Sequence, residues 1–294
     1  MTEAASPSSA PKLSLLCCTV GRTDKLDRLL ASLARQTLAD FELVIVDQNE
    51  PGVLDPVLAP YADRINLHHI RSERGLSRAR NVGLAQCRAD IVAFPDDDCW
   101  YPDTLAETIV SLFEAAPEAG VFTGRTVDAA GADSLGLFLD RDAEITKSGV
   151  WLIGNSNSLF IRTSIARKIG GFDETLGVGA PTAFKSGEET DFLLRALATG
   201  ARGFYRRDVL VHHDQAPVGG AGGVARAQDY ARGFGRVLRL HDYGAAYVAM
   251  RVARTSARAL LALLTGDIAT ARYKALWALG TFRGFIAPLP ERGA

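Results

Sequence analysis

The first hundred residues repeat one pairing, a short apolar run followed by a helical pattern, and this repeat constrains the fold more than any other feature. The run over residues 13–20 (LSLLCCTV) is almost continuously apolar, as in a strand buried on both faces. Leucines at helical spacing then predict a helix over 24–36. The pairing continues with strands predicted at 41–46, 65–70 and 91–94 and a helix predicted at 76–86. Strands that alternate with helices predict an α/β fold, in which a mostly parallel open sheet is flanked by helices.

Three of these predicted strands end at, or just before, a residue suited to ligand binding. Thr19, Asp47 and Asp96 each stand at or just beyond the carboxyl end of a strand. In open parallel sheets, ligands bind in the crevice outside the carboxyl ends of the strands. The convergence of these residues therefore predicts a binding site at that edge of the sheet.

The strongest chemical signal is the run of three aspartates at positions 96–98, directly after the predicted strand 91–94. Adjacent carboxylates repel one another, and a divalent cation with a preference for oxygen ligands neutralises them. Mg²⁺ or Mn²⁺ bridging to a diphosphate fits such a motif. The alternative reading is a solvated turn whose aspartates cap a helix near 100–103.

The remainder of the chain is less regular. Residues 121–162 are typical of shorter strands and loops, 188–198 predict a helix with an apolar face, and 209–211 predict a strand. The glycine-rich segment 219–223 is expected to be a mobile loop, and the pattern beyond it is helical. The chain is thus expected to comprise a disordered leader (1–11), an α/β domain (12–215), a glycine-rich loop (216–224) and a basic helical C-terminal region (225–294).

Charge is distributed unevenly along the chain. The formal net charge is −1, which gives no global field to attract nucleic acid. Residues 225–294, however, carry eleven Lys and Arg against four Asp and Glu, so this tail is suited to an anionic surface. The four cysteines lack metal-site or disulfide spacing, which indicates a reducing compartment.

Segments that would direct the chain into or across a membrane are not found in the sequence. There is no run of 18 apolar residues and no signal-peptide pattern. A cytoplasmic protein without a membrane-spanning helix is expected, with peripheral contact at the inner face of the membrane left open.

Six segments occur in an order that defines a known family. They are 13–22, 41–50 (FELVIVDQNE), 74–83 (RGLSRARNVG), 94–102 (FPDDDCWYP), 170–174 (GGFDE) and 186–195 (SGEETDFLLR). Together they resemble the family 2 glycosyltransferases, and the resemblance covers residues 13–213. It implies a GT-A fold, with a Rossmann-like nucleotide half and an acceptor half in the catalytic domain 12–215, followed by a C-terminal helical extension.

The resemblance also implies a role for each matching residue. The nucleotide-sugar contacts would be Thr19, Arg22, Asp47, Arg80, Asp96 and Asp97. Asp98 would ligate Mn²⁺ or Mg²⁺, with His212 as a further contact to the metal or diphosphate. His212 is preferred over His213 because strand alternation points the two in opposite directions. Asn155 and Asn157 lie where the family places donor-sugar contacts, although turn chemistry explains asparagines equally well.

The same resemblance implies an inverting transfer of a hexosyl group from a nucleotide-diphosphate sugar. The family usually has a Glu-Asp pair in which the aspartate is the catalytic base, whereas residues 188–191 here read EETD. Glu189 occupies the base position, and Asp191 is the alternative. The base would deprotonate the acceptor hydroxyl as it attacks the anomeric carbon, and the metal would stabilise the departing nucleoside diphosphate.

The C-terminal region suggests where the acceptor is found. Residues 247–286 combine arginines at 251, 254 and 258 with leucines and aromatic residues, a pattern typical of helices in a membrane interface. A glycan, a lipid-linked acceptor or a growing polymer of the cell envelope would suit such a location. The alternatives are that these helices pack on the catalytic domain or form a dimer.

Three other protein classes were weighed. A nucleotidyltransferase that makes the nucleotide sugar would need a glycine-rich first loop with a following basic cluster, and Gly21-Arg22 is too little. A dinucleotide-dependent oxidoreductase would need Gly-x-Gly-x-x-Gly after the first strand, which is missing. A non-catalytic sugar-binding homologue stays open because Glu189 departs from the family pattern.

Overall fold

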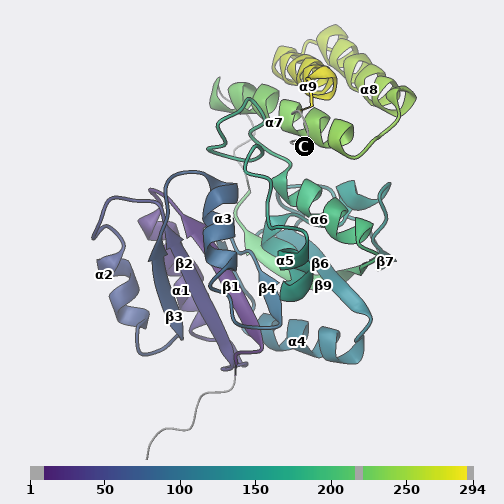
Figure 1. The fold of residues 1–294 in the computed structure, drawn as a ribbon. Helices are drawn as coiled ribbons and strands as arrows, with labels where there is room; N and C mark the ends of the chain where they lie inside the picture. Colours follow the sequence, from purple (N-terminus) through teal and green to yellow (C-terminus); the bar gives the residue numbers. More distant parts are fainter. Residues whose placement is uncertain (1–9, 216–220, 290–294) are drawn as a thin grey trace, which may run out of the picture. The chain divides into compact units, whose positions relative to one another are not determined.

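In the part of the chain that the computed structural model describes, residues 10–215 and 221–289, nine strands form a single sheet (Figure 1). The strands are β1 (Leu13–Thr19), β2 (Phe41–Asp47), β3 (Leu67–Arg71), β4 (Ile91–Ala93), β5 (Cys99–Trp100), β6 (Ala119–Val127), β7 (Ala143–Glu144), β8 (Leu159–Arg162) and β9 (Arg202–His213). The α-helices are α1 (Thr23–Leu33), α2 (Asp55–Leu58), α3 (Leu76–Leu84), α4 (Leu105–Ala115), α5 (Thr163–Lys168), α6 (Glu188–Ala198), α7 (Ala221–Leu240), α8 (Ala245–Leu264) and α9 (Ile268–Ile286). Short 3₁₀ helices occur at Ala59–Tyr61, Val150–Leu152 and Ser156–Ser158.

The strands follow the spatial order β3-β2-β1-β4-β8-β6-β9-β5, with β7 beside β9. Strands β1 to β4 are mutually parallel, and so are β6 and β9, whereas β8 runs antiparallel between β4 and β6. In the β1–β2 register Thr19 pairs with Asp47, so the two carboxyl ends are level. The predicted class is confirmed: a mostly parallel sheet flanked by helices, with a helical C-terminal region.

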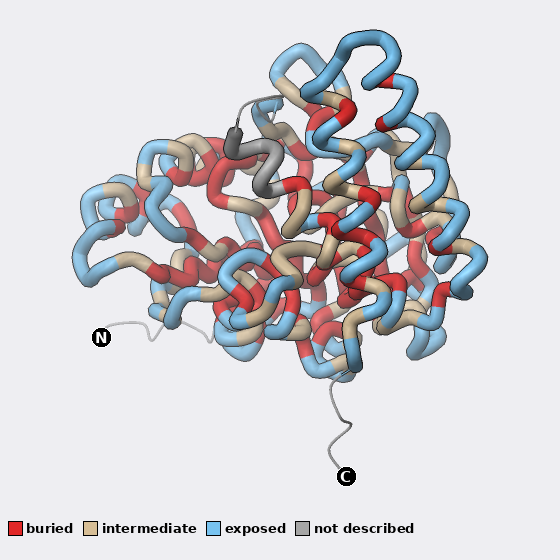
Figure 2. Tube along the Cα trace, turned by 90° about the horizontal axis from the view of Figure 1, so that it is seen from above, coloured by how far each residue is buried: buried red, intermediate tan, exposed pale blue. Residues whose placement is uncertain are grey.

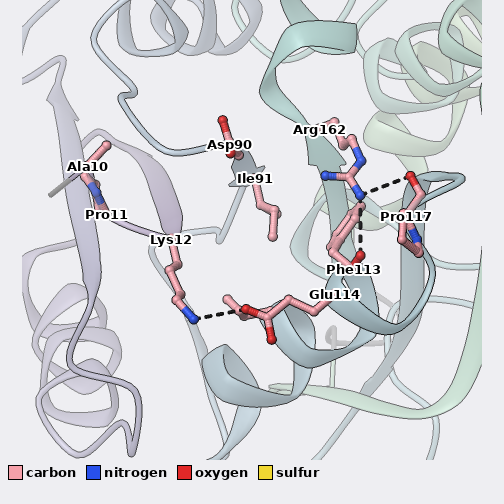
Figure 3. Close-up of a pocket in the computed structure, with 10 residues that line it drawn as sticks. Ala10, Pro11, Lys12, Asp90, Ile91, Phe113, Glu114, Pro117 and Arg162 are labelled. Atoms are coloured by element: carbon pink, nitrogen blue, oxygen red, sulfur yellow. Dashed lines mark hydrogen bonds and ion pairs between the residues drawn. The ribbon is translucent and has the colours of Figure 1, made fainter.

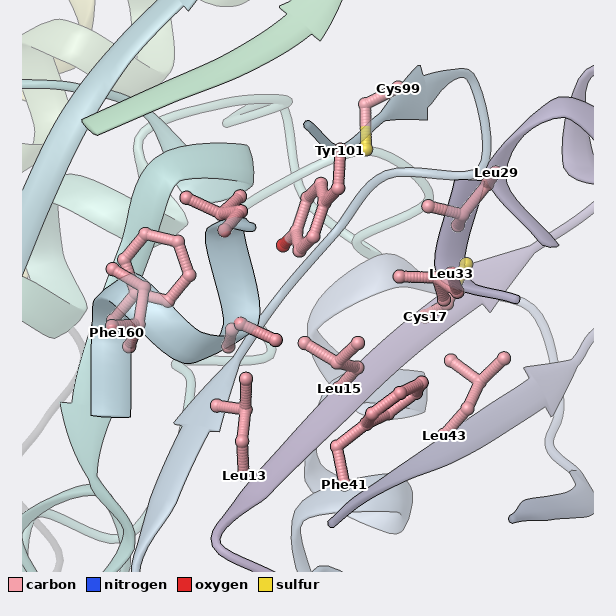
Figure 4. Close-up of a cluster of buried hydrophobic side chains, with 14 of the residues drawn as sticks. Leu13, Leu15, Cys17, Leu29, Leu33, Phe41, Leu43, Cys99, Tyr101 and Phe160 are labelled. Atoms are coloured by element: carbon pink, nitrogen blue, oxygen red, sulfur yellow. The ribbon is translucent and has the colours of Figure 1, made fainter. Parts of the chain in front are cut away.

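The apolar run of β1 is buried on both faces because helices cover both sides of the sheet. Leu13, Leu15 and Cys17 point to one side, into a core formed with leucines of α1 and apolar residues of α4 (Figure 4). Leu16 points to the other side. Buried residues accordingly follow the strands and the inner faces of the helices, while exposed residues lie on loops and outer helix faces (Figure 2).

Gly83, in the last turn of α3, lets that helix lie close to the second face of the sheet. A Cβ at this position would collide with the Leu16 side chain and lie 2.8 Å from Val46 Cγ2. We expect Gly83→Ala to destabilise the fold by about 1–3 kcal/mol, because overpacking outweighs the helix propensity gained. Urea denaturation measures the effect. Gly244→Ala is the control, since nothing lies within 4 Å of its added Cβ, and equal midpoints for both variants would contradict this close packing.

The chain forms two compact units that do not follow simple sequence boundaries. Among the described residues, the first unit contains 10–73, 79–171 and 196–215, and with it the sheet. The second contains 74–78, 172–195 and 221–289. The segment that carries the first turn of α6 therefore belongs with the C-terminal helices, although the sequence predicted one continuous domain over 12–215.

In the second unit, α7 and α9 pack closely through glycines. An added Cβ at Gly235 would clash with backbone atoms of Thr281 and Phe285, and one at Gly284 would clash with backbone atoms of Arg232 and Arg236. Small residues at these positions allow the two helix backbones to approach each other. Across the described residues, no helix has the length and apolarity needed to span a bilayer.

Several elements differ from the expectations. Helix α4 was not predicted, and the region 121–162 includes most of the nine-residue strand β6. Residues 221–223, expected in a mobile loop, begin helix α7. The rest of that loop, 216–220, and most of the expected leader, 1–9, lie outside the described residues.

Candidate active site

The acidic motif is held against the carboxyl end of β1 by backbone pairing. Asp96 forms a parallel bridge with Cys18, and β5 that follows it pairs antiparallel with the end of β9. The register of this second pairing sets Cys99 opposite His213. As a result, the three aspartates lie between the loop after β1 and the last residues of β9.

Asp97 and Asp98 share Arg22 of the loop after β1. Arg22 Nη1 donates to Asp97 Oδ1 at 3.2 Å and to Asp98 Oδ2 at 2.5 Å. The Thr19 hydroxyl donates to Asp97 Oδ2 at 2.7 Å. Burial raises the pKa of Asp97 above its usual value, and the Thr19 and Arg22 contacts oppose this effect only in part. Thr19 and Arg22 thus both contact the acidic motif.

Asp98 also contacts a histidine. His213 Nε2 lies 3.0 Å from Asp98 Oδ1. Burial raises the pKa of Asp98, but the hydrogen bond and charge of His213, together with Arg22 and Lys25, outweigh it and leave the pKa below its usual value. Burial lowers the pKa of His213, and the contacts with Asp98 and the Asp214 carbonyl overcome it, so the net shift is upward. Asp98 is therefore an ionised carboxylate at neutral pH.

His212 and His213 do point in opposite directions, as strand alternation requires, but His213 is the one that faces the motif. The His212 ring stacks on Trp100 at a centroid distance of 5.1 Å, and its Nδ1 lies 3.4 Å from the Asp128 carbonyl oxygen. The Arg28 guanidinium lies over the same Trp100 ring, 3.8 Å from its centroid. The predicted contact of His212 with the metal site is thus replaced by a contact of His213 with Asp98.

Asp96 lies beneath the other two aspartates and contacts Arg80. Arg80 is 2% exposed, and its Nη2 donates to Asp96 Oδ1 at 3.4 Å. With its amide nitrogen turned toward the carboxylate, Asn157 donates to both oxygens of Asp96. Enclosure by the protein raises the pKa of Asp96 to about 6, against the opposing charge of Arg80, although 32% of the side chain is exposed. Arg80 and Asn157 therefore hold a carboxylate that is near the point of protonation.

Asp47 is fully buried at the end of β2 and organises the neighbouring loop. Its Oδ1 accepts from the backbone N and Nδ2 of Asn49, each at 2.8 Å, and its Oδ2 lies 3.1 Å from His69 Nε2. Asn49 Oδ1 in turn accepts from Gly21 N at 2.6 Å. The loops after β1 and β2 are thereby tied together at the predicted nucleotide edge. Asn49 was missed by sequence reasoning, because its role depends on the β1–β2 register.

The donor atoms at the motif fit a cation whose coordination shell is completed by atoms of a bound ligand. Asp98 and His213 offer one carboxylate and one imidazole, and among the described side chains no cluster of three or more His, Cys, Asp or Glu could hold a metal alone. Mg²⁺ and Mn²⁺ are commonly bound by one or two carboxylates with substrate phosphates and water as the remaining ligands. The residues present therefore suit a metal that arrives with a diphosphate.

The two candidate bases lie at the start of α6, in the second unit, and have different surroundings. Asp191 is 3% exposed, with Oδ1 2.8 Å from His241 Nε2 and Oδ2 accepting from Arg195 Nε at 2.8 Å. Glu189 is partly exposed. Both oxygens of Asp191 are thus in contact with side chains of the second unit, which hold the carboxylate in place.

A pocket of about 400 Å³ lies at the opposite edge of the sheet, where β1 and β4 begin (Figure 3). It is lined by Lys12, which pairs with Glu114, and by Arg162, which donates to the Phe113 and Pro117 carbonyls. None of the predicted site residues lines it. The chemistry-bearing residues gather instead at the carboxyl edge.

Parallel strands that end at an acidic motif define the glycosyltransferases of the GT-A fold. A mannosyltransferase from Pyrobaculum calidifontis, solved in complex with GDP-Man and Mn²⁺, superposes with a TM-score of 0.63 and 20% identity over 94% of this chain and 88% of that one. Residues 14–162, half of the chain, match the sequence model of Glycosyl transferase family 2, and the chain belongs to that family.

Two relatives illustrate the range of the family. A pre-mycofactocin glycosyltransferase of Mycobacterium tuberculosis is 30% identical over 190 residues, 60% of this chain and 38% of the relative. A glucosyl-dolichyl phosphate glucuronosyltransferase of Haloferax volcanii is 26% identical over 224 residues, 69% of each chain. The chain thus spans less than two thirds of the length of the mycobacterial relative.

Proposed function

We propose that this protein is an inverting glycosyltransferase that moves a sugar from a nucleotide-diphosphate donor to a hydroxyl acceptor with the help of a divalent metal. The observation that carries the proposal is the arrangement at the carboxyl edge of β1. There Asp98 is ionised and contacts His213, while Asp97 is bound by Thr19 and Arg22 of the neighbouring loop. Membership of the family supports the same reaction class.

The donor would lie along the ends of β1 and β2. Asp47 and the loop tied to it by Asn49 are suited to the base and ribose, because they offer fixed polar groups at the level where the strands end. Arg80 and Arg22, which contact Asp96 and Asp98, would supply positive charge for phosphates, and Asp96 would contact the ribose or metal. Asn157, which holds Asp96, is placed to extend this row toward the sugar.

Asp98 and His213 would hold Mn²⁺ or Mg²⁺ together with the diphosphate of the donor. When bound, the metal supplies positive charge that makes the nucleoside diphosphate a better leaving group. The P. calidifontis mannosyltransferase in complex with GDP-Man and Mn²⁺ supports this pairing of metal and nucleotide sugar. Arg22, which bridges Asp97 and Asp98, would be free to turn to the phosphates once the cation neutralises the carboxylates.

Glu189 would be the general base. Its carboxylate takes the proton of the acceptor hydroxyl, the acceptor oxygen forms a bond to the anomeric carbon, and the bond from that carbon to the diphosphate oxygen breaks. A single displacement from the face opposite the leaving group inverts the anomeric configuration. The partial exposure of Glu189, against 3% for Asp191, favours Glu189 for this role.

A glycan or lipid-linked hydroxyl is the acceptor class that we propose. The H. volcanii relative, named for glucosyl-dolichyl phosphate, supports a lipid-linked acceptor. The basic helices over 247–286 would then provide peripheral contact with the membrane in which such an acceptor resides.

Thermal-shift measurements with UDP-, GDP- and dTDP-sugars test the donor site. One of these donors, with Mn²⁺ present, should raise the melting temperature by several degrees, because a ligand at about 100 times its Kd stabilises by about 2.7 kcal/mol. Asp47→Asn should lose most of that shift, whereas the exposed control Asp63→Asn should keep it. If no donor shifts the wild type, or if Asp47→Asn responds fully, the proposed donor site is wrong. Release of pyrophosphate from a nucleoside triphosphate and a sugar 1-phosphate, in place of release of nucleoside diphosphate from a nucleotide sugar, would indicate a nucleotidyltransferase.

A further inference from the structure

Helix α8 packs on α9 by one face and leaves an apolar face outward. Its buried positions include Val248, Ala259 and Ala262. The opposite positions recur at three- and four-residue spacing and so share one side of the helix. This outer face of α8 consists of Met250, Ala253, Ala257, Leu260, Leu261 and Leu264, all of them exposed.

The exposure of these side chains is large for leucines. Leu261 is 63% exposed and Leu264 is 76% exposed, and Ile268, the first residue of α9, is 60% exposed. Contiguous exposed apolar surface usually marks an interaction site, whereas single exposed apolar residues are common on any protein. We therefore expect the outer face of α8 to contact a partner molecule or a membrane.

The charge beside this face identifies the occupant. Arg254 and Arg258 lie one turn apart along one edge of the outer face, and both are exposed. Neither α8 nor α9 contains an aspartate or glutamate, whereas together they carry five arginines and one lysine. The one carboxylate in the turn between the two helices, Asp267, caps α9 by accepting from Thr270 N. An apolar face edged by arginines complements an anionic lipid surface, into which the leucines insert while the guanidinium groups contact headgroup phosphates.

A second copy of the chain fits this face less well. A symmetric dimer would set the same face against itself, and in either orientation α8 of the second copy offers the arginines no carboxylate to pair with. We propose that the outer face of α8, with Ile268, docks the protein in the interface of an anionic membrane, with α8 lying parallel to the surface. This deepens the membrane contact proposed above, and it does not depend on sugar transfer.

Co-sedimentation with lipid vesicles tests the surface. Wild type should bind vesicles of phosphatidylcholine with roughly one third phosphatidylglycerol at least 20-fold more tightly than pure phosphatidylcholine, and added salt should weaken the binding. Arg254→Gln/Arg258→Gln should lose about 25-fold, since each basic residue contributes roughly fivefold. Leu261→Ser/Leu264→Ser should lose about 100-fold, since each buried leucine contributes at least roughly tenfold.

The matched control is Leu137→Ser/Arg141→Gln, which removes a 78% exposed leucine and an exposed arginine from the first unit and should bind as wild type does. Equal binding to both lipid mixtures, or wild-type binding by the leucine variant, would overturn the proposal. The proposal would also be overturned if analytical ultracentrifugation showed wild type as a dimer and the leucine variant as a monomer. Each variant should keep the donor-induced shift in melting temperature. If wild type binds vesicles but no donor raises its melting temperature, the proposed sugar transfer is wrong and the proposed docking surface is retained.

Discussion

Asp98→Asn should lower the rate of sugar transfer by at least about 10³-fold, because leaving-group stabilisation worth several kcal/mol depends on this carboxylate. The substitution keeps the shape of the side chain but removes the charge that His213 and Arg22 contact. Mn²⁺ should then no longer strengthen nucleotide binding, as measured by calorimetric titration of nucleoside diphosphate with and without the metal. His213→Asn should reproduce part of this loss, and His212→Asn should not.

The control for this prediction is Asp103→Asn, five residues further along the same segment. Asp103 is 53% exposed and pairs with Arg35, so its substitution should leave both turnover and metal dependence unchanged. A variant at Asp98 that retains metal-dependent turnover would show that the carboxylate does not hold the cation. Loss of turnover through misfolding is recognised by a lowered melting temperature.

Glu189→Gln should reduce kcat by about 10²–10⁴-fold, the range that a general base contributes. Donor binding should be unchanged, because the glutamine removes only the proton acceptor. Release of nucleoside diphosphate in the presence of acceptor measures turnover, and the donor-induced thermal shift measures binding. A wild type that binds donor but releases no diphosphate with any acceptor would identify a non-catalytic homologue.

Asp191→Asn separates the two candidate bases. Because Asp191 bonds to His241 and Arg195 in a buried position, its substitution should lower the melting temperature while kcat falls less than tenfold. Glu189→Gln should show the reverse, a smaller change in melting temperature with lost turnover, because Glu189 is partly exposed. The opposite pattern would transfer the role of base to Asp191.

Local pattern was enough to predict the nucleotide half of the fold. β1, β2 and β4 are continuous apolar runs, and α1 has leucines at helical spacing, so each was located within a few residues. These patterns are visible in the sequence because helices cover both faces of the sheet, so strand residues on either face are apolar. Helix α7 was harder: Gly222 and Gly223 have low helix propensity, but the helix they begin packs on α9.

The sequence was enough to predict which residue types form the candidate site, but not which side chains contact each other there. Alternation along β9 correctly separated His212 from His213, yet the one that meets Asp98 is decided by the pairing of Cys99 with His213. Register between strands distant in sequence is set by packing that a single sequence does not reveal. The contact of Asn49 with Gly21 depends on register in the same way.

The contacts at the start of α6 have a consequence for how this protein can be recombined. His241 bonds to Asp191, Ser186 Oγ donates to the Tyr230 carbonyl, and the Arg236 guanidinium lies over Phe184. Residues 172–195 and the helices that follow β9 are therefore one inseparable module. A chimera that grafts the last helices of a relative onto this chain should keep the first turn of α6, with Glu189 and Asp191, intact only if both segments are exchanged together.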